Sequence, residues 1–150
     1  MKVLVTGGCG YVGSALVPAL LEHGHHVTVA DIMWFGCSLE AHPNLCVFEC
    51  DLLRGMGKST PFFNGFDSVI HLAAVANDPC SERDPKLSWE TNVLATAQLL
   101  ALCEFWQVKQ FIYASSGSVY GVSDEPRVTE TCDLLPISEY NKSKMAAERV

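Results

Sequence analysis

The sequence predicts an α/β fold in which a parallel sheet is doubly wound, with helices on both of its faces. Short runs of apolar residues alternate with stretches that have helical spacing, which is the order of an α/β chain. The apolar runs are continuous rather than alternating, as in strands covered on both faces. The length of 150 residues suits one globular domain with its own core.

The expected elements follow one another along the chain. A helix is expected over Tyr11–Glu22, a long helix from about Leu87 to Phe105, and a last helix that begins near Glu139 and still runs at Val150. The expected strands are Lys2–Thr6, His26–Ala30, Leu45–Cys50, Ser68–Ala73 and Gln110–Ser115.

The composition excludes several classes of function. The net charge of −7 argues against an electrostatic binder of nucleic acid. No apolar run reaches the roughly 18 residues of a membrane span. The seven cysteines contain no CxxC pair, so we expect no metal site and no disulfide framework. We interpret them as reduced thiols of a cytoplasmic protein, mostly small apolar fillers, with Cys80 and Cys132 in polar stretches.

A glycine-rich turn joins the first expected strand to the first expected helix. Gly8, Gly10 and Gly13 form GxGxxG in the strand–turn–helix context that gives this motif its meaning. The glycines allow a tight turn and a close approach of the backbone to a pyrophosphate, which meets the free N–H groups of the helix. The turn predicts a Rossmann-type dinucleotide site, and the residues expected to bind the cofactor here are Gly7, Gly10, Tyr11, Val12 and Gly13.

Polar and small residues at the ends of the next strands extend this site. Asp31 can accept hydrogen bonds from both ribose hydroxyls and would repel a 2′-phosphate, which favours NAD over NADP. Asp51, with Leu52, could reach the adenine, although a turn aspartate is nearly as plausible. Small residues after the fourth strand would leave room for a flat cofactor, and the residues concerned are Leu72, Ala73 and Ala74. We interpret His71 as a structural histidine.

Tyr140 and Lys144 are four residues apart and lie on one face of the last helix. A tyrosine hydroxyl is a poor base at neutral pH, and a neighbouring ammonium favours its phenolate. Ser116, at the end of the fifth strand, could hydrogen-bond the same substrate oxygen. Asn92 is either a surface amide or a buried amide that holds this helix or a water.

Taken in order, these motifs resemble the extended short-chain dehydrogenases/reductases, in particular the NAD-dependent epimerase/dehydratase group that acts on nucleotide sugars. The resemblance is carried by TGGCGYVG at Thr6–Gly13, Asp31, Asp51-Leu52, HLAA at His71–Ala74, Asn92, SSGSVYG at Ser115–Gly121 and YNKSK at Tyr140–Lys144.

The resemblance implies a role for each residue of the Ser–Tyr–Lys set. Tyr140 would be the catalytic base, Lys144 would bind the nicotinamide ribose and tune Tyr140, and Ser116 would polarise the sugar hydroxyl. Ser115 and Asn92 would also contact NAD. The first step would be oxidation at sugar C4, and a homodimer is possible. Dehydratases of the group add an acidic pair after the catalytic Ser or Thr, whereas this sequence has Gly117-Ser118 there. The resemblance therefore favours a nucleotide-sugar epimerase, which returns the hydride to the other face of the 4-keto sugar, over a dehydratase.

The family's members are considerably longer than this chain, with a C-terminal part that supplies most of the sugar-nucleotide pocket. We therefore expect residues 1–150 to be a single NAD-binding domain, truncated before the substrate-binding part, with the fifth strand at a sheet edge. The alternatives are a non-catalytic NAD-binding module or fragment, and a nucleotide-sugar dehydratase or carbonyl reductase of the same family.

Overall fold

The computed structural model describes residues 1–55, 65–123 and 126–150. The described chain forms two compact units. The first comprises residues 1–73 and 98–114, and the second comprises residues 74–97 and 115–150. A single domain over residues 1–150 stays a prediction, and each unit is described by itself below.

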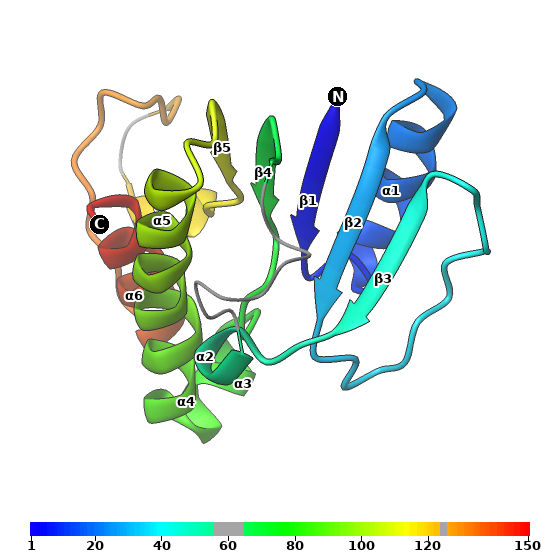
Figure 1. The fold of residues 1–150 in the computed structure, drawn as a ribbon. Coiled ribbons are helices and arrows are strands. Elements are labelled where there is room, and N and C mark those ends of the chain that lie inside the picture. Colours follow the sequence, from blue (N-terminus) through cyan, green and yellow to red (C-terminus); the bar gives the residue numbers. More distant parts are fainter. Residues whose placement is uncertain (56–64, 124–125) are drawn as a thin grey trace. The chain divides into compact units, whose positions relative to one another are not determined.

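The first unit contains a five-stranded sheet in the order β3-β2-β1-β4-β5, and every neighbouring pair is parallel (Figure 1). This confirms the predicted parallel α/β sheet of Rossmann type, and it confirms the fifth strand as an edge of the described sheet. The strands are β1 (Lys2–Thr6), β2 (His26–Asp31), β3 (Leu45–Glu49), β4 (Ser68–His71) and β5 (Gln110–Tyr113).

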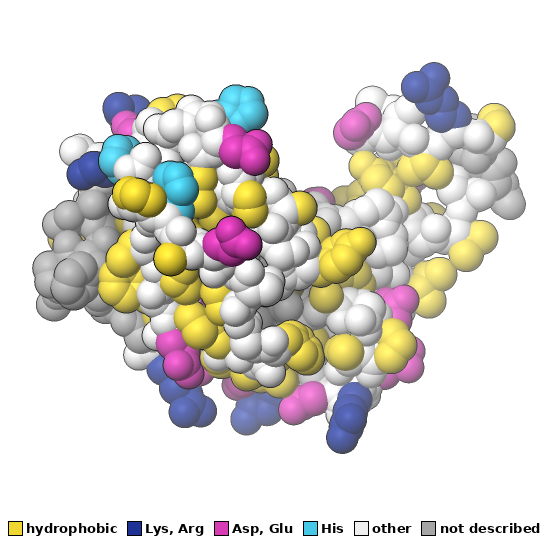
Figure 2. Space-filling model, turned by 90° about the vertical axis from the view of Figure 1, so that its right-hand side faces the viewer, with side chains coloured by type: hydrophobic (Ala, Val, Ile, Leu, Met, Phe, Trp, Pro, Cys, Tyr) yellow, Lys and Arg dark blue, Asp and Glu magenta, His cyan; other side chains and the backbone are white. Residues whose placement is uncertain are grey.

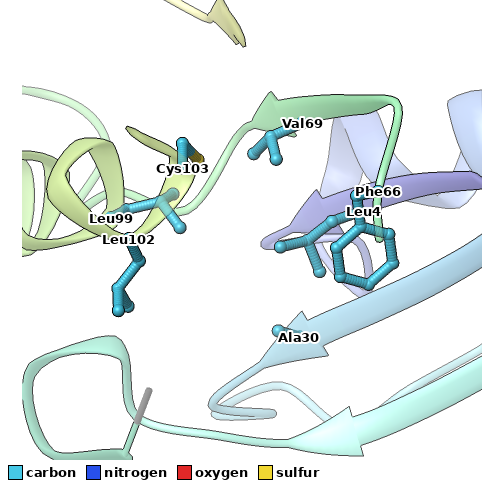
Figure 3. Close-up of a cluster of buried hydrophobic side chains, with 7 residues drawn as sticks. All are labelled: Leu4, Ala30, Phe66, Val69, Leu99, Leu102 and Cys103. Carbon is cyan, nitrogen blue, oxygen red and sulfur yellow. The ribbon is translucent and has the colours of Figure 1, made fainter. Parts of the chain in front are cut away.

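Helices α1 (Tyr11–Glu22) and α5 (Ala95–Phe105) cover opposite faces of this sheet. Side chains alternate along a strand, so Val3 and Val5 face one side of β1 and Leu4 faces the other. Val17 of α1 packs with the two valines. Leu99 of α5 belongs to the cluster of Leu4 (Figure 3). The remaining labelled members of that cluster are Ala30, Phe66, Val69, Leu102 and Cys103.

Three strands end earlier than the sequence predicts. The third stops at Glu49 rather than Cys50, the fourth at His71 rather than Ala73, and the fifth at Tyr113 rather than Ser115. The cause is the neighbouring strand, because Thr6 is the last residue of β1 to pair and its partner in β4 is His71. After His71, the Leu72 N–H still bonds the Thr6 carbonyl at 3.0 Å, but β1 has no further paired residue and the chain then leaves the sheet.

The second unit is mainly helical. It contains α3 (Asp78–Arg83), α4 (Pro85–Trp89), the π-helical segment η1 (Glu90–Leu94), the first turn of α5, the 3₁₀ turn η2 (Gly117–Tyr120) and α6 (Glu139–Glu148). The long helix was predicted to begin at Leu87, but it begins at Pro85. There the Asp84 carboxylate accepts from the Leu87 N–H at 2.9 Å and proline occupies the first turn.

The last helix also differs slightly from its prediction. It ends at Glu148 rather than continuing through Val150, and the Arg149 N–H bonds the Ala146 carbonyl at 3.1 Å. A bond of this i to i−3 type tightens the final turn of a helix.

The expectation that most cysteines fill apolar space is wrong. All seven are free thiols, but most do not fill apolar space: Cys103 is buried, whereas Cys37, Cys46 and Cys80 are exposed. Cys132, expected in a polar stretch, is partly buried. Cys46 is exposed because it lies on β3, which has a neighbour on one side only within the described sheet.

Charged side chains of both signs share the surface of the molecule. On the face seen in Figure 2, Lys and Arg side chains lie in small separate groups with acidic side chains beside them. Within the residues described, no helix is long and apolar enough to cross a membrane. In the same part of the chain, no group of three or more His, Cys, Asp or Glu residues could hold a metal ion.

Candidate active site

The glycine turn between β1 and α1 can be built only from residues with little or no side chain. Gly7 has φ +72°, and a Cβ added there would lie 2.5 Å from the backbone nitrogen of Ala73. A Cβ on Gly13 would run into the backbone of Gly8, where α1 meets the turn. The turn therefore lies against the end of β4, where a side chain at Gly7 would not fit.

The N-terminus of α1 is left without a side-chain cap. Its N-cap residue is Gly10, whose own N–H donates to the Gly7 carbonyl at 3.1 Å. The first residues of the helix, Tyr11 and Val12, have exposed side chains. An uncapped 12-residue helix presents free N–H groups and a partial positive charge, which together suit a phosphate.

Asp31, the last residue of β2, is hydrogen-bonded to the glycine turn. One carboxylate oxygen accepts the Cys9 N–H at 2.9 Å, and the other accepts the Met33 N–H at 2.7 Å. Each oxygen can accept a second hydrogen bond, so acceptor capacity for two hydroxyl groups remains. Asp51 accepts from the Leu53 N–H at 3.0 Å and begins α2 (Leu52–Gly55), which is the turn role that the sequence left open.

The end of β4 combines a structural histidine with small residues. His71 is buried and its Nδ1 is hydrogen-bonded to the Thr6 hydroxyl, which confirms the structural interpretation. Leu72 and Ala73 follow it and are partly exposed, and the Leu72 N–H continues the sheet by bonding the Thr6 carbonyl at 3.0 Å. Ala74 is also partly exposed.

In the second unit, α6 carries Tyr140 and Lys144 on one face. The helix begins at Ser138, whose hydroxyl accepts the Asn141 N–H at 3.1 Å. Lys144 is only 3% exposed. Burial lowers the pKa of Lys144 from 10.5 to about 8, and the Glu148 carboxylate one turn later opposes part of that shift. Lys144 is thus a buried ammonium that is still mostly protonated at neutral pH.

Ser116 is tied to α6 through a chain of hydroxyl groups. Its Oγ lies 2.6 Å from the Ser118 Oγ and also accepts the Ser118 N–H at 3.2 Å. The Ser118 hydroxyl in turn donates to the Asn141 Oδ1 at 2.7 Å. Because Asn141 directly follows Tyr140, this chain sets the position of Ser116 relative to the backbone that carries Tyr140. Ser115 bonds farther along α6, where its hydroxyl donates to Glu148.

Asn92 is the buried amide that the second interpretation of this residue required. Its Oδ1 accepts the Val75 N–H at 2.8 Å, and its Nδ2 donates to the Val75 carbonyl at 3.1 Å and to the Ser143 Oγ at 2.9 Å. Ser143 lies on α6, so Asn92 holds that helix. Asn92 belongs to η1, and π-helical turns of this kind are frequent at functional sites. A direct contact between Asn92 and a cofactor stays a prediction.

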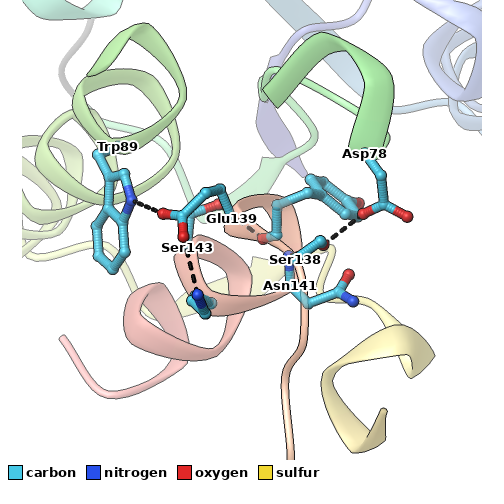
Figure 4. Close-up of polar contacts among 8 residues, drawn as sticks. Asp78, Trp89, Ser138, Glu139, Asn141 and Ser143 are labelled. Atoms are coloured by element: carbon cyan, nitrogen blue, oxygen red, sulfur yellow. Dashed lines mark hydrogen bonds and ion pairs between the residues drawn. The ribbon is translucent and has the colours of Figure 1, made fainter. Parts of the chain in front are cut away.

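Several residues of this network were not singled out from the sequence. Trp89 Nε1 donates to Glu139 at 2.9 Å, and Ser138 donates to Asp78, so α6 is bonded to α4 and α3 (Figure 4). The starts of α3 and α4 could have been predicted from the sequence. Asn77-Asp78-Pro79 and Asp84-Pro85 each place a capping residue before a proline in the first turn of a helix. No sequence pattern indicated that Trp89 would bond Glu139, which is 50 residues away.

The predicted site residues divide between the two units. The first unit holds Gly7, Gly10, Tyr11, Val12, Gly13, Asp31, Asp51, Leu52, Leu72 and Ala73. The second holds Ala74, Asn92, Ser115, Ser116, Tyr140 and Lys144. In the first unit the glycine turn lies against Ala73 and its Cys9 N–H bonds Asp31, and in the second unit Asn92 bonds Ser143 of α6.

Comparison with known proteins places this arrangement in a family. The model of the NAD dependent epimerase/dehydratase family matches residues 3–150. This chain belongs to that family. It is 32% identical to UDP-glucose 4-epimerase of Lactobacillus helveticus, with 100% of this chain and 46% of that protein aligned.

Solved structures agree with the sequence relatives. UDP-glucose 4-epimerase of Thermotoga maritima with UDP-glucose matches with a TM-score of 0.90 and 33% identity, covering 99% of this chain and 49% of that one. The Thermus thermophilus UDP-glucose 4-epimerase complex with NAD matches with a TM-score of 0.87 and 35% identity, over 99% and 49% of the two chains. The chain spans about half the length of the relatives it matches.

Proposed function

We propose that the first unit binds NAD. The observation that carries this proposal is the glycine turn, in which a Cβ on Gly7 would strike Ala73 and the N-terminus of α1 has no side-chain cap. The diphosphate would lie on that turn and helix, and Asp31 would accept the hydroxyls of the adenosine ribose. The UDP-glucose 4-epimerase from Thermus thermophilus, a family relative, was solved as a complex with NAD.

We further propose that the chain supplies the Ser–Tyr–Lys residues of a nucleotide-sugar 4-epimerase. NAD, when bound, supplies the acceptor of a hydride and later returns it. Tyr140 would take the proton of the sugar C4 hydroxyl, and the buried ammonium of Lys144 on the same helix face would stabilise the phenolate. Ser116, whose position is fixed by its hydrogen bonds to Ser118, would hydrogen-bond the same sugar oxygen.

Epimerisation is favoured over dehydration by the residues after Ser116. Elimination of water needs an additional acid and base. Gly117 has no side chain to supply either, and the Ser118 hydroxyl is engaged as a hydrogen-bond donor to the Asn141 Oδ1 at 2.7 Å. Both UDP-glucose and UDP-galactose would serve as substrates, because a 4-epimerase works in both directions. We also propose that the protein forms a homodimer and lies in the cytoplasm.

The test separates binding from chemistry. Calorimetric titration of the chain with NAD is expected to give saturable binding, and Asp31→Ala should weaken it and relax the discrimination against NADP. Addition of UDP-glucose to the NAD-loaded chain should produce the near-ultraviolet absorbance of reduced nicotinamide, and Tyr140→Phe should abolish that signal with NAD affinity nearly unchanged.

Two results would contradict these proposals. Absence of NAD binding would exclude the first of them. Binding without reduction by UDP-sugars would favour the second candidate, a non-catalytic NAD-binding module, whose supporting observation is the compact first unit that holds all the residues of the glycine turn and Asp31. Full activity of Tyr140→Phe would exclude the assigned base.

A further inference from the structure

The backbone of Tyr140 lies between two residues of α6 that are bonded to other parts of the second unit. The Ser143 hydroxyl accepts from Asn92 at 2.9 Å and donates to the Tyr140 carbonyl at 2.8 Å. On the other side of Tyr140, Ser138 caps α6 and donates its hydroxyl proton to the Asp78 carboxylate (Figure 4). The position of Tyr140 is therefore set by contacts at both of these neighbours.

Both sets of contacts lead to one short stretch of chain, residues 75–78. At its beginning, the buried Val75 bonds the Asn92 amide through its N–H at 2.8 Å and its carbonyl at 3.1 Å. At its end, the exposed Asp78 carboxylate accepts from Ser138. One end of this stretch thus reaches α6 through Asn92, and the other end reaches it directly. The role of Asn92 in holding α6 is described above, whereas Asp78 has been given no role in the proposed chemistry.

The residue before Asp78 has a strained backbone. Asn77 has φ 71° and ψ 159°, a combination that residues other than glycine rarely adopt. The start of α3 holds it there, because the Asn77 side chain accepts the Cys80 N–H at 3.1 Å and its carbonyl accepts the Ser81 N–H at 3.3 Å. Such strain persists only where the surroundings impose it, and it is concentrated at functional sites. The backbone from which the Asp78 carboxylate reaches Ser138 is therefore held in one conformation.

We propose that Asp78 is a positioning residue for Tyr140, because its carboxylate orients the hydroxyl group that begins α6. The inference rests on the proposed role of Tyr140 as the base. The Ser138 hydroxyl has one proton, and donating it to Asp78 leaves the oxygen free to accept the Asn141 N–H at 3.1 Å. A hydrogen bond to a carboxylate is stronger than one between neutral groups. Without it, the first turn of α6, which carries the Tyr140 phenol, is held less firmly.

The position of Tyr140 matters for the rate of the reaction rather than for binding. A general base must lie within hydrogen-bond reach of the proton that it takes, and a small displacement of a reacting group slows the chemical step. The proposed contacts of NAD with the glycine turn and Asp31 belong to the first unit, whereas Asp78 and α6 belong to the second. Loss of the Asp78 carboxylate is therefore expected to lower the rate of hydride transfer and to leave the affinity for NAD unchanged.

The experiment mixes the NAD-loaded chain of 150 residues with UDP-glucose and follows reduction of the nicotinamide. Asp78→Ala should lower the rate at saturating UDP-glucose by about tenfold, with the half-saturating UDP-glucose concentration unchanged. Asp78→Asn keeps an oxygen that accepts from Ser138 and should restore most of the rate. The matched control Glu82→Ala, which removes an exposed carboxylate from the same helix, should keep the wild-type rate. Combining Asp78→Ala with Ser138→Ala should slow the reaction no further than the slower single variant.

Three outcomes would overturn the role of Asp78: Asp78→Ala as fast as Glu82→Ala, Asp78→Asn as slow as Asp78→Ala, or additive losses in the double variant. A raised half-saturating UDP-glucose concentration with a normal rate at saturation would also overturn it, because Asp78 would then contact the substrate.

A second measurement separates this proposal from the proposed function. If the wild-type chain reduces no NAD, the proposed chemistry fails, and amide hydrogen exchange followed by NMR decides whether Asp78 holds the start of α6. The N–H groups concerned are those of Asn141, bonded to the Ser138 hydroxyl, and Lys142, bonded to the Ser138 carbonyl. Their exchange should be faster in Asp78→Ala than in Asp78→Asn or Glu82→Ala. Equal exchange in all three variants would overturn the inference without reference to activity.

Discussion

Replacing Asn92 with alanine should destabilise the protein strongly, because this amide makes three buried hydrogen bonds. The change removes the partner of the Val75 N–H at 2.8 Å, of the Val75 carbonyl at 3.1 Å and of the Ser143 hydroxyl at 2.9 Å. Ser143 keeps the Tyr140 carbonyl as an acceptor at 2.8 Å, but both backbone groups of buried Val75 lose the amide.

An unpaired buried polar group costs about 1–3 kcal/mol, so the two groups of Val75 together give a loss of roughly 3 kcal/mol for Asn92→Ala. For a chain of this size the melting temperature should fall by on the order of 10 °C. Urea unfolding followed by tryptophan fluorescence, with an unchanged slope, measures the free-energy difference.

The matched control is Gln98→Ala, which removes an exposed amide from the same long helix. This control should change the free energy of unfolding by less than about 0.5 kcal/mol. If Asn92→Ala costs no more than Gln98→Ala, the claim that Asn92 holds α6 is wrong.

Three further substitutions test other parts of the structure. Gly7→Ala should prevent NAD binding and destabilise the chain, since its Cβ would lie 2.5 Å from the Ala73 nitrogen at φ +72°; calorimetry with normal NAD affinity would disprove this. Lys144 has a pKa of about 8 in the folded chain against 10.5 ordinarily, so the unfolded chain binds more protons between these pH values and the stability that this group confers rises with pH. From pH 8 to 10.5, the free energy of unfolding measured in urea should therefore increase more for the wild type than for Lys144→Met. An equal change in both proteins would contradict the lowered pKa. Ser138→Ala removes the hydroxyl that accepts the Asn141 N–H and should lower the free energy of unfolding by about 1 kcal/mol. An unchanged thermal unfolding curve would show that this hydroxyl does not stabilise the helix.

Much of the first unit could be predicted because its signals are local. The glycine turn, the strand before it and the helix after it are contiguous, so spacing alone indicates the conformation that the chain adopts there. The predicted helix Tyr11–Glu22 has the observed bounds. Strand ends were less accurate, since the last paired residue depends on the neighbouring strand, as His71 does on Thr6.

The candidate site was predictable as a set of residues but not as a set of contacts. YNKSK indicated that Tyr140 and Lys144 share a helix face, because that depends only on the helical repeat. The partners of Asn92 were not predictable, since Val75 and Ser143 lie 17 and 51 residues away. The cysteines were misjudged for the same reason: hydrophobicity suggests burial, but the edge position of β3 leaves Cys46 exposed.

By itself, the amino-acid sequence determined the type of fold, the dinucleotide turn and the identity of the chemical groups, because these follow from short spacings and from side-chain chemistry. Tertiary structure alone decided that Lys144 is buried with a lowered pKa and that Asn92 bonds two distant segments. The physical reason is that desolvation and long-range hydrogen bonds depend on which segments pack together, and packing is a property of the folded chain as a whole.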